Sequence, residues 1–153
     1  MLAVGEIAPD FSVRMPDGSS RPLSSYRGRP LVLFFFPKAN TAGCTRETRG
    51  FAERYPEFQR SGIEVVGVSV DSIEADAAFG AKCGAQFPVV GDPTKEVARA
   101  YGVLGFLGVT RRVTFLLDPD GRVAEVVEGI LPFRHLTTAA EWASRGTTSG
   151  PRG

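Results

Sequence analysis

The sequence predicts an α/β fold in which a central mixed β-sheet is flanked by helices. Continuous apolar runs alternate with amphipathic stretches along the chain, a pattern typical of strands that are buried on both faces and separated by helices. The 153 residues are 42% hydrophobic and 23% charged, which suits one packed domain and leaves no room for a second. We therefore expect one domain over residues 1–145. The Gly, Ser and Thr content of residues 146–153 predicts a flexible C-terminal tail.

The first part of this domain is predicted to be a βαβ unit. Residues 31–36 form the longest apolar run and are expected to be a central strand. Aromatic residues then recur at helical spacing, which predicts a helix from about residue 44 to residue 62, with a kink at Pro56. Residues 63–70 are rich in Val and Ile and predict a second buried strand.

The next helix is predicted to begin after this strand and to be weak at its end. Asp71 or Ser72 can cap it, and it is expected to run through residues 77–79. Gly80 and Gly84 then follow, and an interior glycine costs a helix about 1 kcal/mol relative to alanine. We therefore expect the last turn of this helix to open easily.

The second half of the chain predicts a short strand, a helix, a hairpin and a final helix. Asp92 and Pro93 supply a cap and a first-turn proline, and Gly102 ends that helix. The tetrapeptide Asp-Pro-Asp-Gly at 118–121 has turn chemistry and joins two antiparallel strands. In chain order the elements are the strand 87–90, the helix up to residue 101, the strands 113–117 and 123–127, and the helix 131–143. This order suits a thioredoxin-like fold.

Composition excludes several classes of function. The 18 basic and 17 acidic residues leave a formal charge of +1, so a nucleic-acid partner is not expected. The longest apolar run is far shorter than the roughly 20 residues of a membrane span, so no membrane partner is expected either. The N-terminus lacks the pattern of a secretory signal, which makes the cytoplasm the expected location. His135 is the single histidine and the two cysteines are far apart, so we expect no metal site and no cofactor, and any histidine-based dyad would have to use His135.

Cys44 is the first candidate for a reactive residue because it stands at the start of a predicted helix, just after a predicted strand. A helix N-terminus presents unpaired N–H groups and a partial positive charge, both of which favour a thiolate. Such a thiolate would be a nucleophile. On composition alone, a cysteine that only packs in the core is an equally good interpretation.

Three motifs decide between these interpretations. Residues 37–44 read P-K-A-N-T-A-G-C, which resembles the P-x-x-x-T-x-x-C active-site signature of the peroxiredoxins, and residues 43–47 resemble its Q-type, bacterioferritin-comigratory subgroup. Residues 5–11 resemble the opening motif of the family, and residues 112–118 resemble its R-x-T-F segment. The resemblance runs almost end to end.

This resemblance implies a thiol-dependent peroxidase that reduces hydrogen peroxide and organic hydroperoxides through a sulfenic acid on Cys44. It implies that the Thr41 hydroxyl and the Cys44 amide hold the peroxide, and that Arg112 contacts both thiolate and substrate. Pro37 would keep water out. Glu47, one helical turn after Cys44, would orient an arginine through a charge-assisted bond.

Structural roles for the same residues stay open at this point. Thr41 can cap the helix with the same oxygen, and Glu47 can be an acid favoured by the helix dipole. Arg111 and Arg112 are neighbours at a strand start, so their side chains point to opposite faces and one of them at most can reach Cys44. The motif register selects Arg112 and leaves Arg111 as an exposed charge.

The second cysteine departs from the common pattern of the subgroup. Many members carry a resolving cysteine five residues after the first, where this chain has Arg49. Cys83 is the remaining candidate, as in a subset of the family, and it would form an intramolecular disulfide that thioredoxin or a similar reductant recycles. Helix ends would have to open for this. The alternatives are a buried Cys83 with a low-molecular-weight thiol resolving Cys44, or a non-catalytic, chaperone-like protein with the same fold.

The apolar, glycine-rich segment 102–110 leads into Arg112. Leu104, Phe106 and Leu107 are therefore candidates for a pocket rim that takes bulky hydroperoxides, or for a dimer contact. A buried core loop is an equally good interpretation. We expect a monomer or a weak homodimer.

Overall fold

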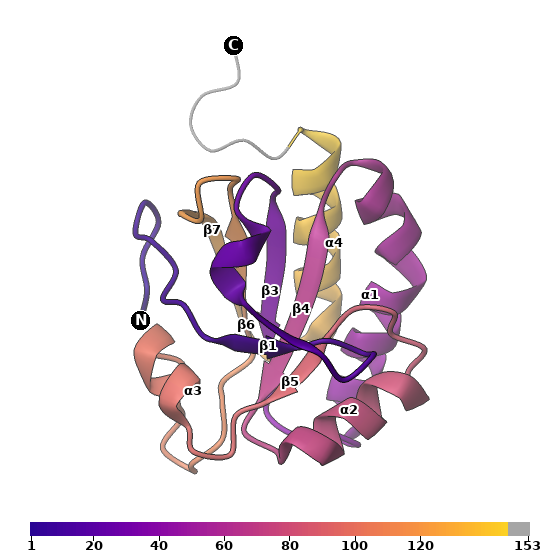
Figure 1. Cartoon of the computed structure of the whole chain (residues 1–153), viewed down its shortest axis with the longest axis vertical. Coiled ribbons are helices and arrows are strands. Elements are labelled where there is room, and N and C mark those ends of the chain that lie inside the picture. The colour runs from indigo at the N-terminus through magenta and orange to yellow at the C-terminus, as the bar shows by residue number, and fades with distance from the viewer. Residues whose placement is uncertain (147–153) are drawn as a thin grey trace.

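Five strands form one mixed sheet in the order β5-β4-β3-β6-β7 in the computed structural model, which describes residues 1–146 (Figure 1). The central strand β3 pairs in parallel with β4 and antiparallel with β6. β4 and β5 are parallel, and β6 and β7 form the antiparallel hairpin. The bounds are β3 Leu31–Phe35, β4 Glu64–Ser69, β5 Val89–Gly91, β6 Val113–Leu117 and β7 Val123–Glu128. The predicted α/β fold with a central mixed sheet is confirmed.

Helices cover both faces of this sheet (Figure 1). On one face, α1, α2 and α4 contribute to an apolar cluster that also contains Cys44 and Cys83. On the other face, α3 and the N-terminal segment pack against alternate residues of the same strands, among them Leu33 and Phe35. β3 is therefore buried on both sides, as its unbroken apolar run predicts. The helix bounds are α1 Ala42–Arg60, α2 Ile73–Lys82, α3 Glu96–Tyr101 and α4 Pro132–Ser144.

The N-terminal segment contains structure that the sequence does not reveal. β1 (Ser12–Arg14) and β2 (Ser20–Pro22) form a separate two-stranded sheet, and a 3₁₀ helix follows at Leu23–Tyr26. These strands are three residues long and almost entirely exposed. They show neither an apolar run nor a clear alternation, so period-based prediction has nothing to detect.

Helix ends differ in detail from the prediction. Ser72 rather than Asp71 caps α2, since its side chain accepts a hydrogen bond from the Ala75 amide. α3 begins at Glu96, three residues later than Pro93 suggests. The Asp92 carboxylate nevertheless accepts from the amides of Val97 and Ala98. Asp92 thus acts as a cap from a distance, across a turn in which Lys95 has a left-handed backbone.

The prediction that Gly80 and Gly84 weaken the last turn of α2 is wrong for Gly84, which is not part of the helix. Gly84 lies beyond the helix, after the C-cap residue Cys83, with φ +79°. That conformation favours glycine and is a normal helix stop. Gly80 is buried, and a Cβ there would lie 2.8 Å from Val89 Cγ2. Gly80 therefore permits close packing of α2 on β5.

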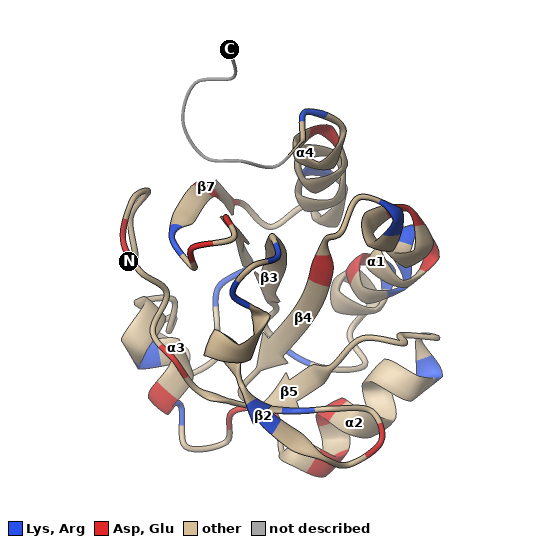
Figure 2. Cartoon of the chain, turned by 45° about the horizontal axis from the view of Figure 1, so that its top comes forward, with Lys and Arg blue, Asp and Glu red and all other residues tan. Residues whose placement is uncertain are grey.

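The remaining surface is mixed in charge. Basic and acidic residues alternate over the elements, most visibly on α1 (Figure 2), which agrees with the net charge of +1. Within residues 1–146 no helix is long and apolar enough to cross a bilayer. Arg145 belongs to the folded part, because its side chain binds Glu125. Of the predicted tail, residues 146–153, the part from residue 147 onward lies outside the described residues.

Candidate functional site

Cys44 lies in the first turn of α1, directly after the loop that leaves β3. Its side chain is 1% exposed and belongs to the apolar cluster under α1 and α4. Thr45 is the first residue of α1 whose amide bonds back into the helix, to the Thr41 carbonyl. The amides of residues 42–44 thus point out of the helix end without intrahelical partners. A negative charge on the Cys44 sulfur would lie in the field of this helix end.

Arg112 reaches Cys44 from the position directly before β6. Its Nη2 donates to Cys44 Sγ at 3.5 Å, and its Nε donates to the Ile130 carbonyl at 2.9 Å. Gly43 makes this approach possible, since a Cβ at that position would lie 3.0 Å from Arg112 Nη2. Arg111 points the other way and pairs with Glu128 at 2.7 Å on the surface. The structure thus brings Arg112 to the sulfur and leaves Arg111 exposed.

Glu47 holds the far side of the same guanidinium. Its Oε1 accepts from Arg112 Nη1, and both side chains are buried. Burial raises the pKa of Glu47 to about 7, against the opposing effect of Arg112. Glu47 Oε2 has no hydrogen-bond partner among the described residues. Glu47 therefore faces inward to orient Arg112, rather than outward as a solvent-facing acid of the first turn.

His135 supports this pair from α4, a contact that sequence reasoning missed. Its Nε2 lies 2.8 Å from the Gly129 carbonyl, which can only accept, so Nε2 carries the hydrogen. Nδ1 then accepts from the Thr114 hydroxyl at 2.8 Å. Burial lowers the pKa of His135. The neutral ring lies 3.9 Å from Glu47 Oε2 and braces the turn that supplies the Ile130 carbonyl.

Thr41 and Pro37 belong to the loop between β3 and α1 that precedes Cys44. Thr41 is the N-cap residue of α1, but its side chain makes no capping bond; its hydroxyl donates to the Lys38 carbonyl at 2.8 Å. Thr41 is exposed as a residue, and a hydroxyl that donates one bond can still accept another. Pro37 is half-buried at the start of the same loop.

Neighbouring elements hold this loop, residues 37–41, at three points. The Thr110 hydroxyl donates to the Phe36 carbonyl just before it. The Ala39 amide donates to Asp71 Oδ2 at 2.8 Å, and Lys82 Nζ donates to Asn40 Oδ1 at 3.3 Å. None of these contacts has a local sequence signal, because every partner is distant along the chain.

Cys83 is the C-cap residue of α2, and its thiol is free and buried. Burial raises the pKa of Cys83, while the charges of Arg49 and Lys82 lower it. Both cysteines belong to one apolar cluster, on the same face of the sheet. Arg49 stands at the position that many Q-type members give to a resolving cysteine. Here its charge lowers the pKa of the Cys83 thiol, against the effect of burial.

The predicted pocket rim divides into two parts. Phe106 and Leu107 are 98% and 78% exposed, so the interpretation of a buried core loop is wrong for them. Leu104 is half-buried and packs in the cluster on the sheet face opposite the one that contains Cys44. It therefore does not share the apolar surroundings of the cysteine.

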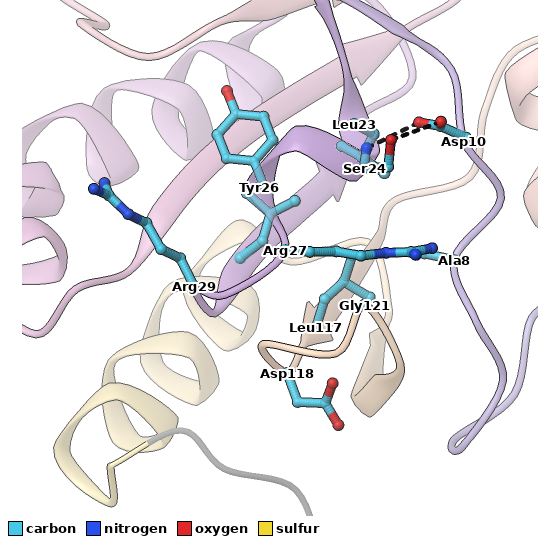
Figure 3. Close-up of a pocket in the computed structure, with 11 residues that line it drawn as sticks. Ala8, Asp10, Leu23, Ser24, Tyr26, Arg27, Arg29, Leu117, Asp118 and Gly121 are labelled. Atoms are coloured by element: carbon cyan, nitrogen blue, oxygen red, sulfur yellow. Dashed lines mark hydrogen bonds between the residues drawn. The ribbon is translucent and has the colours of Figure 1, made fainter.

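A separate pocket lies at the other end of the sheet, between the 3₁₀ helix and the β6–β7 turn (Figure 3). Its polar groups are already used in the fold: the Asp10 carboxylate accepts from the Ser24 amide at 2.9 Å and from its hydroxyl at 2.8 Å. Within the described part of the chain, no cluster of three or more His, Cys, Asp or Glu residues could hold a metal ion.

Comparisons with known proteins give matches over most of the chain. The model of the AhpC/TSA family matches residues 4–126. Peroxiredoxin Bcp of Escherichia coli (strain K12) is 32% identical over an alignment of 148 residues, which covers 92% of this chain and 95% of that protein. The crystal structure of Peroxidoxin BcpB from Mycobacterium tuberculosis has a TM-score of 0.84 at 30% identity and covers 97% of this chain and 100% of its own. Bacterioferritin comigratory protein of Xanthomonas campestris, solved as trapped intermediate and ligand complexes bearing on its alkyl peroxide reduction activity, has a TM-score of 0.82 at 30% identity, with 90% and 92% coverage.

Proposed function

The chain belongs to the AhpC/TSA family as a peroxiredoxin of the Bcp and Q type, a thiol peroxidase, and we propose that Cys44 is the residue that attacks the peroxide. One observation carries this assignment. The Cys44 sulfur combines a position at the amino end of α1 with a donor, Arg112 Nη2, at 3.5 Å. Both features stabilise a thiolate and the negative charge that develops on peroxide oxygen.

In the first step the Cys44 thiolate attacks the terminal oxygen of the hydroperoxide. An S–O bond forms and the O–O bond breaks, so that sulfur is oxidised to a sulfenic acid and the alkoxide or hydroxide leaves. Arg112 and the amides at the helix end face the charge as it moves along the S–O–O line. In this proposal the Thr41 hydroxyl oxygen accepts a hydrogen bond from the peroxide, and Pro37 limits the entry of water. The leaving oxygen takes a proton from solvent and becomes alcohol or water.

Glu47 acts through Arg112 rather than on the substrate. Its carboxylate fixes one arm of the guanidinium, the Ile130 carbonyl fixes Nε, and the remaining arm is directed at the sulfur. A planar guanidinium can serve three partners in fixed geometry, which lysine cannot do.

Cys83 completes the cycle in this proposal. Its thiol attacks the sulfur of the sulfenic acid, an S–S bond forms, and hydroxide leaves with the thiol proton as water. Both cysteines lie in one apolar cluster. Burial raises the pKa of Cys83, and the charges of Arg49 and Lys82 oppose that rise. A thioredoxin-like protein or a low-molecular-weight thiol then reduces the disulfide. Because this disulfide lies within one chain, it does not link two chains covalently, and we propose a monomer or a weak homodimer.

The substrate class is hydrogen peroxide and organic hydroperoxides. A groove between α1 and α4 passes the first turn of α1 and has apolar and charged lining residues. The apolar ones include Ala42, Phe133 and Leu136, and the charged ones are Arg46, Arg49, Glu53 and Arg54. The apolar wall of the groove suits the carbon chain of an organic hydroperoxide. Alkyl peroxide reduction by the Xanthomonas relative supports the same class.

Peroxide consumption by Cys44→Ser and Cys83→Ser tests the assignment. Cys44→Ser is expected to consume no peroxide. Cys83→Ser is expected to consume one equivalent and then to stop unless an external thiol is added. Loss of the first turnover in both variants would contradict the assignment of Cys44 as the sole attacking residue.

A further inference from the structure

Ser69, the last residue of β4, lies between two carboxyl groups. Its Oγ is 2.7 Å from Asp71 Oδ2 and 2.6 Å from Asp76 Oδ2. The Asp71 amide also points at Ser69 Oγ, at 3.2 Å. Ser69 and Asp76 have no exposed surface, so the contacts are made without bulk water.

The contacts of Ser69 Oγ can all be satisfied only if one of the two carboxyl groups is protonated. A hydroxyl has one hydrogen and can donate to one carboxylate only, and an ionised carboxylate can only accept. With two ionised carboxylates, one of them would face a lone pair of Ser69 Oγ at hydrogen-bond distance. If one carboxyl carries a proton, Ser69 donates once and accepts twice, and all three contacts are satisfied.

Asp76 is the group that fits the protonated form. It is fully buried, whereas Asp71 is half-exposed and accepts a further bond from the Ala39 amide. Asp76 Oδ1 has no hydrogen-bond partner among the described residues, which is tolerable for the carbonyl oxygen of a neutral acid and costly for an anion. Burial raises the pKa of Asp76 to about 7, and the charge of Asp71 raises it while bonds from Ser69 lower it.

The charged group that faces Asp76 is Asp71, from the turn after β4. β4 itself contributes the uncharged Ser69, and the Ala39 amide of the loop before α1 bonds Asp71 rather than Asp76. Glu74, in the same turn of α2, is exposed to solvent. The amino end of α2 favours a negative charge on Asp76, and burial next to Asp71 opposes it.

This network ends on the loop of residues 37–41 that precedes Cys44. Asp71 Oδ2 receives both the Ser69 hydroxyl and the Ala39 amide. Ala39 is buried in the apolar cluster that contains Cys44. The position of the loop, and with it of Thr41, therefore depends on where Asp71 is held.

We propose that Asp76, in its protonated form, is a positioning residue for the peroxidase reaction, acting through Ser69 and Asp71 on the loop of residues 37–41. Loss of its proton leaves one hydroxyl hydrogen for two anions, so one of the two contacts breaks. Asp71 then holds Ala39 less firmly, and the arrangement of Thr41 and Cys44 loosens. The inference rests on the proposed function, since it assigns Asp76 a part in the attack of Cys44 on peroxide.

The variant Asp76→Asn keeps a hydrogen-bond donor at position 76 but removes its titration. An asparagine amide donates to Ser69 at every pH and cannot ionise. Asp76→Leu is the matched control, because it removes the donor at every pH. In this variant Ala39 is expected to be poorly protected even at low pH. All other titrating groups are common to wild type and Asp76→Asn, so a ratio between the two proteins at each pH reports Asp76.

Two measurements between pH 6 and pH 8.5 test the proposal. The hydrogen-exchange protection of the Ala39 amide, followed by NMR without peroxide, is expected to fall about tenfold in wild type over this range and to stay constant in Asp76→Asn. The rate constant for peroxide attack in Asp76→Asn, divided by that of wild type, is expected to be near one at pH 6 and to rise severalfold at pH 8.5. Asp76→Leu, where it folds, is expected to show low Ala39 protection at both pH values.

Constant Ala39 protection in wild type would overturn the proposal, as would a ratio of rate constants that does not change with pH. The exchange measurement needs no activity. A wild-type protein that fails to reduce peroxide at either pH would therefore overturn the proposed function, and the exchange data would still decide whether the Asp76 proton holds the loop.

Discussion

Replacing Arg112 by alanine removes the side chain that donates to the Cys44 sulfur at 3.5 Å. A hydrogen bond to a charged group contributes about 1.5–3 kcal/mol, and about 1.4 kcal/mol in the barrier changes a rate tenfold. Attack on peroxide is therefore expected to slow by roughly 10- to 150-fold in Arg112→Ala. Loss of the same contact to the departing oxygen would place the value at the upper end.

The same substitution also destabilises the fold, because it leaves Glu47 buried without its partner. Removing one member of a buried ion pair costs about 3–5 kcal/mol. Burial holds the pKa of Glu47 at about 7 even with Arg112 present, so without Arg112 the carboxyl is expected to take up a proton. Arg112→Lys separates charge from geometry: it keeps the positive charge but cannot serve Glu47, Ile130 and Cys44 together. We expect it to fall between wild type and Arg112→Ala.

Stopped-flow fluorescence of the single tryptophan offers the assay. Trp142 is buried in the apolar cluster that contains both cysteines, so oxidation of Cys44 is expected to change its emission. Arg111→Ala is the matched control, because Arg111 makes an exposed pair with Glu128, and such pairs contribute little. Equal slowing in Arg111→Ala and Arg112→Ala, in proteins that circular dichroism shows to be folded, would refute the assignment of Arg112.

Three further predictions follow from particular contacts. Gly43→Ala places a Cβ 3.0 Å from Arg112 Nη2 and is expected to slow peroxide attack without a large loss of stability; an unchanged rate constant would show that Arg112 can shift freely. Urea titrations are expected to show that Gly84→Ala, at φ +79°, and Gly80→Ala, whose Cβ would meet Val89, each lower the free energy of unfolding by about 1–2 kcal/mol. Replacing an ordinary glycine inside a helix by alanine would instead raise it. The pKa of Asp76 is raised from 3.8 to about 7, so its contribution to stability is full below pH 3.8 and is lost as the pH rises to 7. The free energy of unfolding of Asp76→Asn, relative to that of wild type, is therefore expected to rise by up to roughly 4 kcal/mol across that interval, and a difference that does not change with pH would contradict this.

The sequence predicted the parts of the fold whose signal is local. The apolar run that became Leu31–Phe35 and the aromatic spacing within Ala42–Arg60 each identify an element without reference to the rest of the chain. β1 and β2 have no such signal, because they are short, exposed strands. The start of α3 was misplaced because Asp92 caps it across an intervening turn rather than from the adjacent position.

The candidate site divides in the same way. Cys44, Thr41 and the choice of Arg112 over Arg111 could be predicted from motif and register. The bracing of this site by His135, and the control of the loop by Asp76, could not, because both depend on which distant segments pack together. In the sequence Asp76 looks like an ordinary first-turn acid, and the burial and the Ser69 contact from which we infer its proton are visible only in the structure.

Mass spectrometry of the wild-type protein after one equivalent of peroxide tests the central claim most directly. We predict a monomeric chain that has lost two hydrogen atoms, and a Cys44–Cys83 linked peptide after digestion without reductant. A chain one oxygen atom heavier, with a persistent sulfenic acid on Cys44 and no linked peptide, would contradict the two-cysteine mechanism. An unmodified Cys44 would contradict the assignment of Cys44 itself.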